Sequence, residues 1–303
     1  MLKSDHVHDA RALLDAPDSA AGPSRRAALK LGLGVGYAAA ALPIMAQTAI
    51  HTSADGLTAG EVTIDVAGFK MPAYRAQPAG KSGLPVVLVV SEIFGVHDYI
   101  ADIARRFAKL GYLAIAPELF VRQGDAKSYT DIPKLMSELI AKVPDAQVMG
   151  DLDATVAWAA EHGGDTGRLG ITGFCWGGRH TWLFTAHNPK VKAGVAWYGR
   201  LLGQPSELSP QNPVDLAGQL HGPVLGLYGG ADTGITAEAI EQMKDALAKA
   251  AAQGHAAAKA SQFVVYPDAP HAFHADYRPS YRKEAAEDGW KRALAWFKQH
   301  GVA

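Results

Sequence analysis

Short apolar runs alternate with amphipathic segments from about residue 55 to the C-terminus. Unbroken apolar runs, rich in β-branched residues, are typical of strands buried on both faces of a parallel sheet. The predicted strands are 86–90, 112–116, 169–172, 193–197, 224–228 and 262–266. This alternation predicts an α/β fold with a mostly parallel central sheet and helices on both faces.

Apolar residues at helical spacing fill the intervals between these runs. Helices are predicted at 99–110, with Leu110 on the apolar face, around Leu152 and Val156, at 236–252 and at 281–299. Two early strands, 61–66 and 73–77, flank a turn at Gly68. The loop-rich stretch 121–148 and the Pro-containing stretch 201–222 are expected over the strand ends, where they would cap a pocket. We find no repeat and no linker, and predict a single domain over 55–303.

The first fifty residues follow a different pattern. A polar lead ends in Arg25-Arg26, and an apolar run from 31 to 45 follows. The run is shorter than the roughly 20 residues of a spanning helix, so residues 1–50 are interpreted as an export signal with a flexible lead. The arginine pair resembles a twin-arginine signal, which predicts a periplasmic or exported bacterial protein with no stable membrane span after cleavage near Ala46 or Ala49. A tail helix with two chance arginines is the alternative.

Composition narrows the class of partner. The chain is 48% hydrophobic and 19% charged, and its 29 basic and 30 acidic residues give a formal net charge of −1. No basic stripe suits a phosphate backbone, so nucleic acid is excluded as the expected partner and a small-molecule substrate is favoured. The histidines lack metal-site spacing, and neither a metal nor a cofactor is expected. We expect a monomer or a small homo-oligomer.

The chain contains one cysteine, Cys175, in the segment Gly173-Phe174-Cys175-Trp176-Gly177. A predicted strand ends and a helix begins there, as in the G-x-S-x-G nucleophile elbow, with cysteine in place of serine. Glycine is needed at both outer positions because side chains there would collide around a strained turn. The start of the following helix favours a thiolate. The competing interpretation is a buried, inert cysteine.

An acid and a histidine follow in the chain order of such hydrolases. Asp232 ends "LYGGAD" after strand 224–228, and His271 lies in "YPDAPHAF" after strand 262–266. We predict that Cys175 is the nucleophile, His271 its base and later the acid, and Asp232 the group that orients the imidazole. Asp268 is an alternative acid, and His274 is an alternative base.

The segments "SEIFGVHDYI", "GFCWGG", "GGAD" and "PHAF" together resemble the dienelactone hydrolase family of α/β hydrolases. The similarity runs from about residue 58 to the C-terminus. It implies that Glu92 contacts the resting cysteine and helps control its ionisation, and that the backbone N–H groups of Ile93 and Trp176 form the oxyanion hole. Two N–H groups from turns after adjacent strands can converge on one developing oxyanion. A solvated loop carboxylate is the alternative for Glu92.

The resemblance implies thiolate attack on a lactone or carboxylic ester, followed by hydrolysis of the thioester by water that His271 activates. Where the family places a substrate-binding arginine, four residues after the catalytic histidine, this chain has Ala275. Arg122, Arg179 and Arg278 are the other candidates for an anion site. A general carboxylesterase or thioesterase, or a non-catalytic binding protein on the same fold, remain alternatives.

Overall fold

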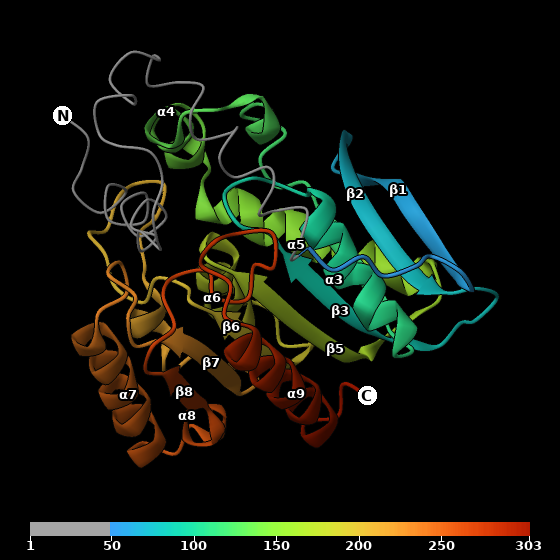
Figure 1. Ribbon diagram of the computed structural model, residues 1–303. Coiled ribbons are helices and arrows are strands. Elements are labelled where there is room, and N and C mark those ends of the chain that lie inside the picture. Colours follow the sequence, from blue (N-terminus) through green and yellow to red (C-terminus); the bar gives the residue numbers. More distant parts are fainter. Residues whose placement is uncertain (1–48) are drawn as a thin grey trace, which may run out of the picture.

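The structure is a computed structural model that describes residues 49–303. Its core is an eight-stranded sheet in the order β1-β2-β4-β3-β5-β6-β7-β8 (Figure 1). The first two strands form an antiparallel hairpin, β1 (Leu57–Val66) and β2 (Phe69–Pro78). The other strands run parallel to one another: β3 (Leu84–Val90), β4 (Leu113–Pro117), β5 (Gly164–Phe174), β6 (Val191–Trp197), β7 (Val224–Gly229) and β8 (Gln262–Tyr266). The predicted α/β-hydrolase fold is confirmed.

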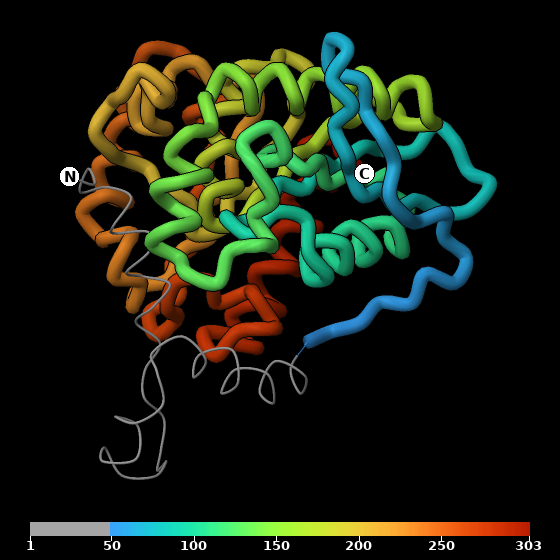
Figure 2. The backbone as a smooth tube through the Cα atoms, turned by 90° about the horizontal axis from the view of Figure 1, so that it is seen from above, coloured from blue at the N-terminus to red at the C-terminus, as the bar shows by residue number. Residues whose placement is uncertain are grey.

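Helices cover both faces of this sheet. One face carries α3 (Asp98–Lys109) and α9 (Lys283–Gln299), where the rings of Phe107 and Phe297 pack 6.0 Å apart. The other face carries α5 (Asp145–Glu161), α6 (Trp176–His187) and α7 (Ala237–Ala252). The view in Figure 2 shows the β1–β2 hairpin at the edge of the molecule opposite α7 and the short α8 (Ala256–Ala260).

The burial pattern explains the arrangement. Every residue of β3 is buried, as expected for a strand with helices on both faces. In α3 the buried side chains include Ile100, Ile103 and Phe107, at helical spacing. The prediction for Leu110 was wrong, because this residue lies just past the helix and is 52% exposed. The helix ends there because Gly111 adopts φ +97°.

The prediction of a loop over 121–148 was also partly wrong. The stretch contains α4 (Ile132–Glu138), two 3₁₀ turns (Ala126–Ser128 and Ile140–Lys142) and the start of α5. The side chain of Asp131 accepts a hydrogen bond from the Lys134 N–H (2.9 Å) and caps α4, and Pro133 occupies its first turn. These local start signals outweigh the weak apolar periodicity of the segment.

The predicted export signal lies almost entirely outside the described residues, in 1–48. Within 49–303, no helix combines the length and apolar character needed to cross a bilayer. The first described residues are held against α3, since Thr52 donates from its N–H and its hydroxyl to the Asp102 carboxylate. Arg105 donates to the Thr52 carbonyl at 2.8 Å.

Candidate active site

Cys175 occupies the turn between β5 and α6, with φ +54° and ψ −114°. This strained conformation is unusual for a residue with a side chain. The flanking glycines allow the turn to form. A Cβ on Gly173 would lie 2.2 Å from the Gly177 carbonyl oxygen, and a Cβ on Gly177 would lie 2.3 Å from the Val90 carbonyl oxygen. The turn therefore packs directly against the end of β3.

We expect Gly177→Ala to destabilise the protein, because the added methyl group would collide with the backbone of β3. Overpacking of this kind costs about 2 kcal/mol or more. Gly150→Ala is the matched control, since Gly150 lies in α5 with no atom within 4 Å of an added Cβ. That change should be neutral or stabilise the helix by up to about 1 kcal/mol. Urea unfolding of both variants would measure the difference, and equal stabilities would contradict the steric argument.

Asp232 and His271 lie in contact at the carboxyl ends of β7 and β8. Asp232 Oδ2 is 2.7 Å from His271 Nδ1. The other carboxylate oxygen accepts hydrogen bonds from the Gly234 N–H (2.8 Å) and the Ile235 N–H (3.1 Å). Because a carboxylate can only accept, Nδ1 carries the hydrogen and Nε2 is the nitrogen left for proton transfer.

The His271 imidazole is buried, and its pKa lies well above the usual range for histidine. Burial alone would lower this pKa, but the charges of Asp232 and Cys175 and hydrogen bonding to both outweigh it. The predicted nucleophile, base and acid are therefore brought together around one imidazole ring.

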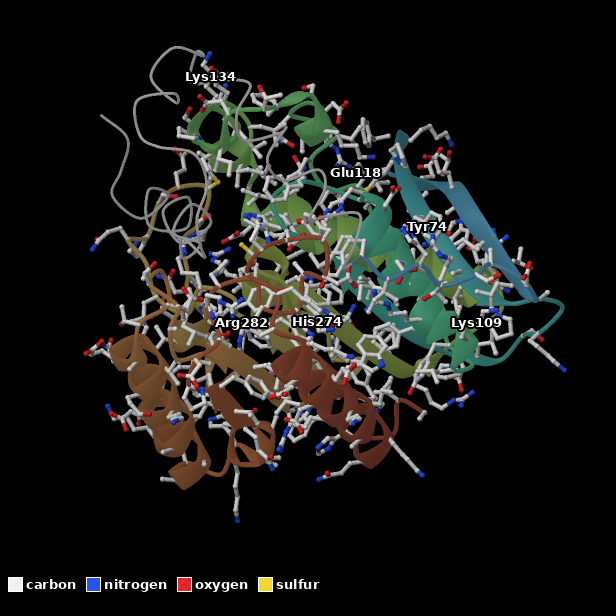
Figure 3. All side chains as sticks on the ribbon, in the orientation of Figure 1. Tyr74, Lys109, Glu118, Lys134, His274 and Arg282 are labelled. Atoms are coloured by element: carbon white, nitrogen blue, oxygen red, sulfur yellow. The ribbon has the colours of Figure 1, made fainter. Side chains whose placement is uncertain are left out.

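The two alternatives, Asp268 and His274, are placed differently. Asp268 is exposed on the loop before His271. His274 Nδ1 is 2.6 Å from the Tyr99 hydroxyl, and its ring packs 4.4 Å from that of Trp197. Burial and the nearby Arg106 hold the pKa of His274 well below its usual range. His274 is thus a neutral histidine packed in the interior. Figure 3 labels it near the middle of the molecule.

Glu92 follows β3 and is 1% exposed. Its Oε2 is 3.2 Å from His97 Nε2 and accepts a hydrogen bond from the Tyr277 hydroxyl at 3.0 Å. Burial would raise the pKa of Glu92, but His97, Arg278 and Tyr277 together lower it, so the carboxylate is ionised at neutral pH. The solvated-loop alternative is wrong.

Sequence reasoning missed His97 and Tyr277. The sequence pattern assigned no role to His97, although this residue lies only five positions after Glu92 on the same loop. Tyr277 lies six positions after His271, on the loop between β8 and α9. Their closeness in sequence to predicted site residues was the available signal.

Ile93 and Trp176 begin adjacent turns. Ile93 is buried directly after Glu92, and Trp176 is the first residue of α6. Gly177 packs so closely against the Val90 and Ser91 carbonyls that these two turns lie side by side. The Trp176 ring packs against Phe120 (4.7 Å) and His180 (3.8 Å).

The candidate arginines have different surroundings. Arg179 donates to both oxygens of Asp145, at 2.6 and 2.7 Å, and is buried. Arg122 donates to Asp151 at 2.5 Å and stacks over Phe69. Arg278 lies over the ring of Phe94, 5.6 Å from its centroid, and its charge helps lower the pKa of Glu92. Of the three arginines, only Arg278 interacts with the Glu92 cluster, which consists of Glu92, His97 and Tyr277.

A groove of about 1390 Å³ borders this cluster. Its lining includes Phe94, His97, Tyr277, Tyr74 and Tyr129. The groove therefore offers an aromatic surface beside the loop that carries Glu92 and Ile93.

Comparison with known proteins identifies the family. The model of the dienelactone hydrolase family matches residues 71–301. The chain belongs to the dienelactone hydrolase family. Two dienelactone hydrolase relatives carry the provisional name carboxymethylenebutenolidase. The one from Methylorubrum extorquens is 60% identical over 92% of this chain and 94% of its own length. The one from Escherichia coli K12 is 56% identical over 88% of this chain and 96% of its own length.

A solved dienelactone hydrolase relative has the same architecture. The crystal structure of a Klebsiella pneumoniae protein, provisionally described as a dienelactone hydrolase, is 57% identical with a TM-score of 0.77. The aligned region covers 80% of this chain and 99% of the Klebsiella pneumoniae chain. The protein is accordingly a hydrolase of the dienelactone hydrolase kind. Among residues 49–303, no group of three or more His, Cys, Asp or Glu is placed to hold a metal ion.

Proposed function

We propose that this protein hydrolyses a lactone or carboxylic ester through Cys175, His271 and Asp232, with a thioester intermediate. The observation that carries the proposal is the buried His271 imidazole, whose Nδ1 is 2.7 Å from Asp232 and whose charge interacts with Cys175. The strained turn at Cys175 supports it, because a non-glycine residue at φ +54° is costly where nothing requires it.

Cys175 attacks the carbonyl carbon as a thiolate, and the carbonyl oxygen takes up negative charge. The backbone N–H groups of Ile93 and Trp176 would stabilise that oxyanion, a contribution on the order of 3 kcal/mol for each donor. His271 then gives its proton to the departing oxygen, leaving a thioester on Cys175. Water, deprotonated by His271, attacks the thioester and releases the acid and the thiolate. Asp232 keeps the imidazole in the correct tautomer throughout.

The single thiol makes the covalent step directly measurable. Rapid quenching of the protein with a short-chain p-nitrophenyl ester, followed by intact-mass measurement, should reveal one acyl group and a burst of p-nitrophenol equal to the enzyme concentration or less. Peptide mapping should locate the acyl group at Cys175. Steady hydrolysis with no adduct at any quench time, and no burst, would count against a thioester intermediate.

Glu92 should oppose ionisation of the cysteine. Both Glu92 and Cys175 raise the pKa of Tyr198, so the carboxylate and the thiol lie near the same hydroxyl. A carboxylate close to the sulfur disfavours the thiolate, and removing its charge favours it. We expect Glu92→Gln to lower the pKa of the Cys175 thiol by about one unit.

The rate of iodoacetamide alkylation as a function of pH measures this change, because Cys175 is the only cysteine. Glu61→Gln is the control, since Glu61 lies on the outer hairpin. A thiol pKa that stays the same or rises in Glu92→Gln would contradict the proposed effect.

A general carboxylesterase or thioesterase activity is the nearest alternative, and a panel of lactones with and without a carboxylate would separate it. Strong preference for carboxylated lactones would indicate an anion site, for which Arg278 is the candidate. We also propose export through the Arg25-Arg26 segment, on the basis of the sequence pattern alone. Cell fractionation tests this, and full-length protein found only in the cytoplasm would refute it.

A further inference from the structure

Tyr198 follows β6 and lies close to both the candidate nucleophile and the candidate base. The carbonyl of the preceding residue, Trp197, accepts a hydrogen bond from the Cys175 N–H at 3.0 Å. The Tyr198 N–H donates to Leu227 on β7 at 2.8 Å, and the Tyr198 ring packs 5.1 Å from the ring of His271. The backbone and side chain of Tyr198 are thus fixed by the same strands that position the candidate catalytic residues.

Two features of Tyr198 cost free energy in the folded protein. Its backbone has φ +39°, which is strained for a bulky residue. The residue is fully buried, and within residues 49–303 its hydroxyl makes no hydrogen bond of normal length and angle. The nearest hydroxyl is that of Tyr99, which pairs with His274 at 2.6 Å and is close enough for a weak hydrogen bond that lowers the pKa of Tyr198. A buried hydroxyl without a hydrogen bond costs free energy, so an orphaned one in a site points to a group that the ligand supplies.

The charge around Tyr198 defines which role the hydroxyl can have. Burial and the charges of Glu92 and Cys175 hold the pKa of Tyr198 well above its usual range. The hydroxyl therefore keeps its proton at neutral pH, and it acts as a hydrogen-bond donor rather than as a base.

We propose that the Tyr198 hydroxyl donates a hydrogen bond to the substrate oxygen that departs when Cys175 is acylated. This inference rests on the proposed function. As the carbon–oxygen bond breaks, its electron pair moves onto the departing oxygen, His271 Nε2 gives that oxygen its proton, and Tyr198 donates without losing its own. The Tyr198 and His271 rings pack 5.1 Å apart and both residues interact with Cys175, so both lie near the carbonyl group that Cys175 attacks.

Leaving-group dependence separates this role from a purely structural one. A p-nitrophenyl ester departs as a stable anion and needs little help, whereas the methyl ester of the same acid departs as a strongly basic alkoxide. Tyr198→Phe should therefore reduce kcat/KM for the methyl ester about tenfold more than for the p-nitrophenyl ester, which corresponds to about 1.4 kcal/mol. The ratio of the two rates does not depend on the folded fraction, because the same folded molecules hydrolyse both esters.

Tyr112→Phe is the matched control. Tyr112 is also buried, but it precedes β4 at the opposite end of the sheet and packs against Phe107. For Tyr112→Phe, the ratio of kcat/KM for the methyl ester to kcat/KM for the p-nitrophenyl ester should equal that of the unmodified protein. Tyr198→Leu provides a second variant without the hydroxyl, and it should give the same change in ratio as Tyr198→Phe.

A ratio within about twofold of the unmodified protein in both Tyr198 variants would overturn the inference. The outcome for Cys175→Ala distinguishes this failure from failure of the proposed function. If Cys175→Ala loses hydrolysis and the ratio is unchanged, only the role of Tyr198 is wrong. If Cys175→Ala hydrolyses both esters normally, the thioester mechanism and the inference both fail.

Discussion

Replacing Cys175 with alanine should reduce kcat/KM for a short-chain ester by a factor of about 10⁴ or more. This corresponds to at least about 5 kcal/mol of lost transition-state stabilisation, because no other group can form the covalent intermediate. Alanine removes only the sulfur and adds no atom that could collide in the buried turn, so we expect the fold to persist. Initial-rate assays on purified variant and unmodified protein provide the measurement, with circular dichroism to verify folding.

Serine at the same position is an informative companion to alanine. Cys175→Ser keeps a nucleophilic atom on the turn, but His271 must deprotonate an alcohol rather than a thiol. We expect detectable activity that is well below that of the unmodified protein and above that of Cys175→Ala. Similar rates for the alanine variant and the unmodified protein would mean that hydrolysis does not use Cys175, and would favour a binding protein with adventitious esterase activity.

The sequence predicted the sheet because buried parallel strands have a strong and simple signal. The run at β3 is apolar at every position, and the structure buries every residue of it. The turn at Cys175 was predictable for a steric reason, since only glycine fits at Gly173 and Gly177. The positions of Asp232 and His271 followed from chain order, because the carboxyl ends of parallel strands meet at one edge of the sheet.

Other parts of the site depend on contacts between loops that are distant in sequence. Tyr277 donates to Glu92 across 185 positions, and no local pattern encodes that meeting. The same applies to Arg179, which could have been a substrate-binding cation until the structure placed the Asp145 carboxylate beside it. Local periodicity reports which face of an element is buried, but it does not report which polar side chains are paired inside.

The buried polar groups of the site have two distinct arrangements. Arg179 and Arg122 each pair with a carboxylate of α5 and so join that helix to α6 and to the loop after β4, although Arg179 Nε is left without a hydrogen bond. Around Cys175 the compensation is incomplete, since Oε1 of Glu92 and the hydroxyl of Tyr198 are buried without hydrogen bonds. Unpaired buried atoms also occur away from the site, at Gln77, Trp296 and His300. Those of Glu92 and Tyr198 differ in lying beside the candidate nucleophile, where a substrate can complete the hydrogen bonds.

Asp232→Asn should reduce kcat by about 10³ to 10⁴ while changing the volume of the side chain very little. The amide can donate to His271 Nδ1, which favours the tautomer with the hydrogen on Nε2 and blocks that nitrogen as a base. Loss of the carboxylate also removes one cause of the raised pKa of His271, so this pKa should fall. The His271 imidazole would then lose its proton at a lower pH than in the unmodified protein.

Asp268→Asn is the control for this change, because Asp268 lies on the same loop as His271 but is exposed. Its kcat should stay within about twofold of the unmodified protein, as expected for a surface substitution away from the site. The pH dependence of kcat for both variants separates the two acids. If Asp268→Asn lost activity and Asp232→Asn kept it, the contact between Asp232 and His271 would be structural, and Asp268 would have to reach the imidazole through a rearranged loop.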